Sequence, residues 1–70
     1  MRHDRKIYLL TSHPPAGLEC VEAFMTLNGA IKAMRQGASE NDLTLVPLKR
    51  TSEEDWETYP YHIRRVQLKT

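Results

Sequence analysis

A single cysteine, Cys20, among 70 residues leaves no partner for a disulfide within the chain. A free thiol without a disulfide framework is typical of a reducing compartment, so we expect a cytoplasmic protein. Glycine is also scarce, and the three glycines, at positions 17, 29 and 37, lie too far apart to form a glycine-rich phosphate-binding loop. The sequence therefore predicts no nucleotide site, and we expect no cofactor.

An excess of charge of one sign is lacking as well. Ten lysine and arginine residues stand against nine acidic residues, so no overall field indicates a nucleic-acid partner. The apolar run after the basic start, Ile7 to Leu10, is too short for a signal peptide or a membrane span. We therefore expect neither a targeting segment nor contact with a membrane.

Paired motifs of the kind that bind zinc, two cysteines or two histidines a few residues apart, are absent. The residues of ligand type are Cys20, His3, His13 and His62. Cys20 with His13 or His62 is the one combination that resembles a nucleophile and its base. A half-buried strand position is the plainer interpretation of Cys20, because free cysteine is among the most buried residue types. We predict no catalytic residue, no metal site and no enzymatic activity.

The length of the chain predicts one small domain, covering residues 1–70. A chain of this size buries only about 60% of the surface that its unfolded form exposes, so its margin of stability is small. Domains this small often gain stability from disulfides, a metal or a second subunit. Since the first is excluded here, we expect a homodimer.

One amphipathic helix is predicted from Thr26 to Gly37. Its apolar positions follow the i, i+3, i+4, i+7 spacing of a single helical face. They are Leu27, Ala30, Ile31 and Met34. Thr26 is the expected N-cap and Gly37 the expected end, with Lys32 and Arg35 near the negative end of the helix dipole. A helix this short is marginal in water, so its apolar face must pack on a sheet.

Four strands are predicted around this helix, because residues alternate between two faces in each of them. They cover residues 6–12, 18–25, 43–48 and 61–68. The first carries large apolar groups on both faces, which favours a central strand or one covered by a second subunit. Two prolines and Gly17 turn the chain after it, so the first two strands are expected to form an antiparallel hairpin. Pro47 lacks an amide hydrogen and moves the third strand toward an edge or a bulge.

The predicted fold class is α+β: a small antiparallel sheet in β-β-α-β-β order with one amphipathic helix packed on one face. Residues 1–5 are expected to fray. Residues 49–59 are expected to form a polar loop with a short helical turn, capped by a hydroxyl and a carboxylate. The two candidate pairs are Thr51 with Glu54 and Ser52 with Asp55.

One helix covers about half of such a sheet, so the uncovered face is expected to keep large apolar side chains that are either shielded locally or meet a partner. We expect some of Tyr8, Leu10, Phe24 and Tyr61 there. The last strand adds a second signal, because its apolar residues change parity between Arg64 and Arg65. Either a bulge resets the register at that point, or one end of the strand packs on a different surface, such as another subunit.

These exclusions favour a small non-catalytic protein that docks on another protein as an inhibitor, adaptor or accessory factor. Compact chains encoded by phages and mobile elements often act in this way, an analogy that rests on size alone. Trp56 is the expected anchor, because an aromatic residue among charges resembles an interface hot spot. Its alternative role is to close the edge of a small core. The predicted contact residues are Trp56, Tyr59, Tyr61, Glu53, Glu54 and Asp55.

The alternative function is that of a nucleic-acid-binding module. Its predicted contact residues are the cations of the last part of the chain, Lys49, Arg50, Arg64, Arg65 and Lys69. Tyr59, Tyr61 and His62 would offer stacking surfaces beside them. Edge strands also carry lysine and arginine to avoid aggregation, and Arg64 and Arg65 point to opposite faces of a regular strand.

Overall fold

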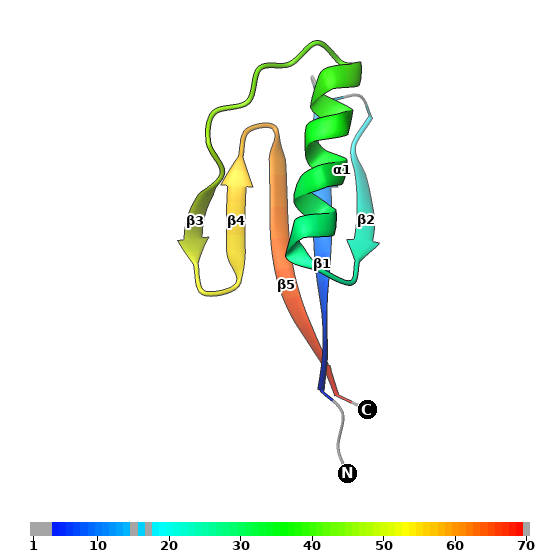
Figure 1. Ribbon diagram of the computed structural model, residues 1–70, viewed down its shortest axis with the longest axis vertical. Helices are drawn as coiled ribbons and strands as arrows, with labels where there is room; N and C mark the ends of the chain where they lie inside the picture. The colour runs from blue at the N-terminus through cyan, green and yellow to red at the C-terminus, as the bar shows by residue number, and fades with distance from the viewer. Residues whose placement is uncertain (1–3, 15, 17, 70) are drawn as a thin grey trace.

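A computed structural model describes residues 4–14, 16 and 18–69 of the chain. Five strands form one antiparallel sheet, and a single helix lies against one of its faces (Figure 1). The elements are β1 (Asp4–Ser12), β2 (Cys20–Phe24), α1 (Leu27–Glu40), β3 (Lys49–Ser52), β4 (Asp55–Thr58) and β5 (Tyr61–Lys69). The α+β class is confirmed, but the order is β-β-α-β-β-β, with one strand more than the sequence predicted. In this part of the chain, no helix combines the length and apolarity that crossing a bilayer requires.

The sheet has the strand order β2-β1-β5-β4-β3, so the strand with two apolar faces, β1, is internal as predicted. β1 and β5 pair along their full nine residues and form the longest strand pair of the sheet. β2 returns beside β1 as the second strand of the predicted antiparallel hairpin. The helix contacts β1 and β2. β4 and β3 lie beyond the helix, toward the opposite edge of the sheet from β2 (Figure 1).

The core lies between α1 and the face of the sheet that α1 covers. Leu10 of β1 pairs with Ile63 of β5 at its centre, and Ile63 is fully buried. The other buried apolar residues are Ala16, Ala30, Met34, Ala38 and Tyr61. Since Ala30, Met34 and Ala38 are spaced by four residues, the buried stripe follows the predicted helical face and extends it by one turn.

The start of the helix is confirmed and its end is not. Thr26 is the N-cap, and its Oγ1 accepts a hydrogen bond from the Gly29 amide at 3.0 Å. The helix continues through Gly37 to Glu40, and Asn41 is the C-cap. Gly37 serves a close approach instead, because a Cβ there would lie 3.0 Å from the Tyr61 hydroxyl.

The segment from residue 43 to 59 differs most from the prediction. Residues 43–48 form no strand; they run extended beside the core, where Leu43, Leu45 and Leu48 are half-buried. The predicted polar loop with a helical turn is instead the hairpin of β3 and β4. Of the two candidate capping pairs, Ser52 and Asp55 do form a hydrogen bond of 2.6 Å, but it lies in the hairpin turn.

β5 pairs with β1 without a register shift, so no bulge accounts for its change of apolar parity. Tyr61 and Ile63 face α1, whereas Val66 and Leu68 belong to the opposite, uncovered face. The prediction that this uncovered face carries Tyr8, Leu10, Phe24 or Tyr61 is wrong. These four residues share the helix-covered face, where they form or flank the core.

Candidate functional site

The uncovered sheet face carries a contiguous apolar patch across β2, β1 and β5. We call it the open-face patch, and its members are Ile7, Leu9, Val21, Ala23, Val66 and Leu68. Val21 is 58% exposed and Leu68 39% exposed, although both are aliphatic. Leu9 pairs with Ala23 on one side and with Arg64 on the other, so a cation borders the patch toward β4. A connected apolar surface of this kind is typical of an interaction site.

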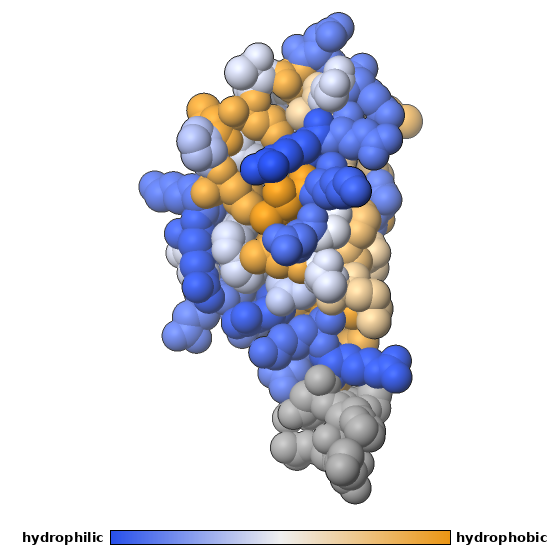
Figure 2. Space-filling view, viewed as in Figure 1, coloured by the Kyte–Doolittle hydropathy of each residue, from blue (hydrophilic) through white to orange (hydrophobic). Residues whose placement is uncertain are grey.

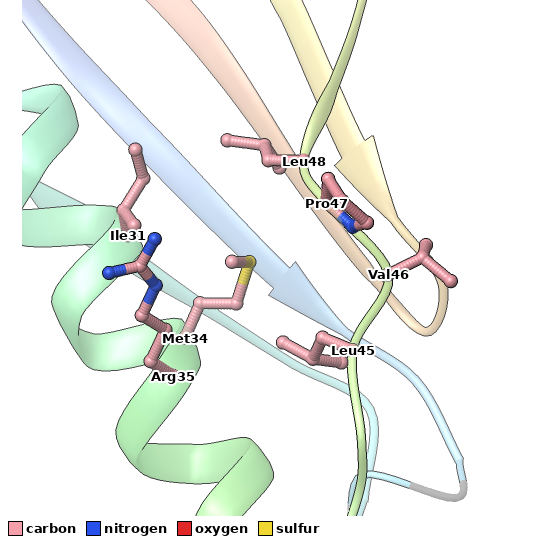
Figure 3. Close-up of a pocket in the computed structure, with 7 residues that line it drawn as sticks. All are labelled: Ile31, Met34, Arg35, Leu45, Val46, Pro47 and Leu48. Carbon is pink, nitrogen blue, oxygen red and sulfur yellow. The ribbon is translucent and has the colours of Figure 1, made fainter.

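On the opposite side of the molecule, a groove of about 310 Å³ separates α1 from the extended segment 43–48 (Figure 3). It is lined by Ile31, Met34, Arg35, Leu45, Val46, Pro47 and Leu48. The space-filling view shows this apolar hollow between hydrophilic side chains on the helix side (Figure 2). We call it the helix groove. Sequence reasoning missed it, because its two walls come from separate segments that only the fold brings together.

Trp56 lies at the centre of an aromatic and cationic cluster on the helix-covered face. Its ring centroid is 6.1 Å from that of Tyr8, at an interplanar angle of 55°. The guanidinium groups of Arg50 and Arg65 lie 5.2 Å and 5.9 Å from the indole centroid. Both guanidinium groups also donate to the Glu53 carbonyl oxygen, at 2.8 Å and 3.0 Å. The indole is therefore half-buried and held from several sides.

Asp55 organises the charged groups of the β3–β4 hairpin on the uncovered side. Its carboxylate accepts hydrogen bonds from Ser52 and Arg64, and His62 Nε2 lies 2.9 Å from Oδ1. The Ser52 hydroxyl is the main reason why the pKa of Asp55 lies below its ordinary value of 3.8. Partial desolvation acts in the opposite direction, and Arg64 and His62 lower the pKa further. The Asp55 carboxylate is therefore already bonded to side chains of its own chain.

The predicted contact residues do not lie on one surface. Tyr59 is 77% exposed in the turn between β4 and β5, whereas Tyr61 is buried in the core. Burial also raises the pKa of the Tyr61 hydroxyl above its ordinary value of 10.0. Glu53 and Glu54 are exposed at the opposite end of β4 from Tyr59, in the β3–β4 turn.

The predicted cations divide between the two faces of the sheet. Arg50 and Arg65 flank Trp56 on the helix-covered face, and Arg64 projects from the uncovered one beside Asp55. Lys49 pairs with Glu57 at the register position next to Arg50 and therefore faces the other way. The side chain of Lys69 lies outside the described residues.

The candidate nucleophile and the two candidate bases each have other partners among the described residues. Cys20 Sγ lies 3.0 Å from Ser12 Oγ, on the edge strand β2. His13 Nδ1 is 2.8 Å from a Glu19 carboxylate oxygen, and His62 belongs to the Asp55 cluster on the uncovered face. Within residues 4–14, 16 and 18–69, no three histidine, cysteine or acidic side chains gather as a metal site would require. His3 lies outside this part of the chain.

The chain matches no protein-family model, no curated protein and no solved structure.

Proposed function

We propose that this chain is a small non-catalytic binding protein that docks through its open-face patch, first of all onto a second copy of itself. The observation that carries the proposal is the position of six apolar residues on the one sheet face that α1 leaves uncovered. Docking onto a further protein, as an inhibitor, adaptor or accessory factor in the cytoplasm, belongs to the same proposal. The free thiol of Cys20 is compatible with that compartment.

The size of the patch sets the expected strength of the dimer. Two strands of nine residues and one of five, about 4.8 Å apart and rising about 3.3 Å per residue, present a plane of roughly 360 Å². Stable interfaces bury about 800 Å² per partner, so this face supports weak pairing. We expect a dissociation constant on the order of 10–100 µM. Sheets that pack face to face in this way form a sandwich about 10 Å apart.

Val21→Glu tests this proposal, since the side chain lies in the patch and is exposed enough to tolerate the change in the monomer. The wild-type mass from light scattering should rise toward two chains between 10 µM and 1 mM. For Val21→Glu we expect a dimer dissociation constant at least tenfold higher than that of the wild type, because pairing would bury an unpaired carboxylate.

Val46→Glu is the matched control for this experiment. Val46 is 66% exposed and lies at the helix groove, on the other side of the molecule, so its replacement should leave self-association unchanged. A wild-type mass of one chain at 1 mM, or equal loss of pairing in both variants, would contradict the open-face proposal.

Nucleic-acid binding is the second candidate, and the observation that favours it is the pair of arginines over Trp56. Single-stranded nucleic acids bind where cations and stacking surfaces lie together. If this candidate holds, a labelled 12-nucleotide single strand should bind in 20 mM salt and dissociate by 200 mM. Arg65→Gln should weaken this binding severalfold, whereas Arg64→Gln, on the other face, should not. Equal effects of the two variants would mean that the binding depends on overall charge and not on the arginines over Trp56, which would contradict this candidate.

A further inference from the structure

The helix groove continues along α1 beyond the hollow shown in Figure 3. A second hollow of about 340 Å³ is lined by Arg35, Ala38, Ser39, Leu43 and Leu45. The two hollows share Arg35 and Leu45, so they form one elongated depression between the helix and the extended segment. This shape suits an extended chain better than a compact small molecule.

The charge of the helix groove has one sign. Arg35 is exposed at the junction of the two hollows, and it forms no ion pair within the described part of the chain. Lys32 lies one turn earlier on α1 and is exposed as well. The lining residues of both hollows include no aspartate or glutamate. An occupant with a carboxylate between aliphatic groups would therefore match the groove in charge and polarity.

The wall opposite α1 offers backbone hydrogen-bonding groups. In segment 43–48, the Leu43 amide donates to the Ala38 carbonyl and the Val46 carbonyl accepts from Thr58. The backbone groups of Thr44 and Leu45 have no partner among the described residues. An extended segment with unpaired backbone groups is a template on which a peptide adds as a further strand.

We propose that the helix groove binds an extended acidic peptide whose aliphatic side chains fill the two hollows and whose carboxylate pairs with Arg35. The guanidinium group favours a carboxylate because it donates two parallel hydrogen bonds in a fixed plane. The peptide backbone pairs with whichever of Thr44 and Leu45 turns its N–H and C=O toward the groove, because neighbouring residues of an extended segment point these groups to opposite sides. This site lies on the opposite side of the sheet from the open-face patch, so it extends the proposed function and does not depend on self-association.

The probe is a fluorescein-labelled peptide of alternating leucine and aspartate, and its partner probe has lysine in place of aspartate. Anisotropy is measured in the Val21→Glu background, so that dimer formation does not affect the result. We expect saturable binding of the acidic peptide alone. Arg35→Gln should weaken it about tenfold, because it removes a charge-assisted hydrogen bond to the carboxylate. Val46→Asp, a change at an exposed rim position, should weaken it by a similar factor.

Lys32→Gln is the matched control, since Lys32 lies on the same helix but does not line either hollow. Its effect should stay below about twofold, as expected for a screened surface charge. Equal losses in Lys32→Gln and Arg35→Gln would overturn the proposal in favour of general electrostatic attraction. Displacement of the peptide by octanoate at equal concentration would overturn it in favour of a small aliphatic carboxylate, and absence of binding at 1 mM protein would also overturn it.

Discussion

Replacing Ile63 with alanine is expected to lower the free energy of unfolding by about 3 kcal/mol, the middle of the range for a buried aliphatic residue cut back to alanine. Ile63 is fully buried opposite Leu10 and beneath α1, so the cavity left behind has no access to solvent. For a domain of this length, the melting temperature should fall by roughly 15 °C. Urea unfolding followed by circular dichroism measures the loss directly.

Val66→Ala is the control for this prediction. Val66 lies three residues further along the same strand but on the uncovered face, where it is half-exposed in the single chain. At a protein concentration too low for self-association, Val66→Ala should lower the free energy of unfolding by less than about 1 kcal/mol, because it removes fewer contacts. Similar losses for the two variants would mean that both sheet faces are equally buried, which contradicts the assignment of one helix-covered face.

The helix was predictable because its signals are local. The spacing of its apolar residues and the hydroxyl of Thr26 act within a few residues of one another, and both have the predicted roles. Gly37 gave a wrong end because its role is tertiary: it makes room for the Tyr61 hydroxyl, 24 positions later. Since the helix continues to Glu40, Arg35 is not near its end and faces the helix groove instead.

The hairpin of β3 and β4 was not predictable from apolar alternation. All four residues of β3 are exposed, so no buried face marks it as a strand. Its Arg50 pairs with Trp56 of β4, a contact between strands that apolar alternation does not report. Residues 43–48 show the converse: alternation is present, but their half-buried leucines pack beside the core outside the sheet. Alternation reports which side chains are buried and does not report whether the backbone joins a ladder.

For the candidate sites, the sequence predicted only that some apolar surface would remain uncovered, and not which residues form it. The parity change in β5 correctly indicated two different surfaces, yet the sequence assigned the wrong residues to the uncovered face. That assignment depends on which side of the hairpin α1 packs, and α1 covers the face with Tyr8 and Phe24. Both faces of β1 are apolar, so local pattern alone does not decide between them.

Trp56→Ala is expected to lower the free energy of unfolding by about 2 kcal/mol, less than for a fully buried tryptophan because the ring is half-exposed. The indole contacts Tyr8 and lies beneath the guanidinium groups of Arg50 and Arg65. Each cation–π contact contributes about 0.5–1 kcal/mol at such a site, and the substitution removes both contacts. Urea unfolding followed by far-ultraviolet circular dichroism, which does not depend on tryptophan fluorescence, provides the measurement.

Trp56→Phe separates packing from surface recognition. A phenyl ring keeps the contact with Tyr8 and a face for the two arginines, so we expect it to retain more than half of the stability lost in Trp56→Ala. A residue that acts only as an anchor for a partner would behave differently: both variants would unfold at the wild-type urea concentration. Since Trp56 lies on the helix-covered face and the open-face patch lies on the other, both variants should also self-associate like the wild type. Loss of self-association in either variant would place the dimer contact on the helix-covered face and contradict the open-face proposal.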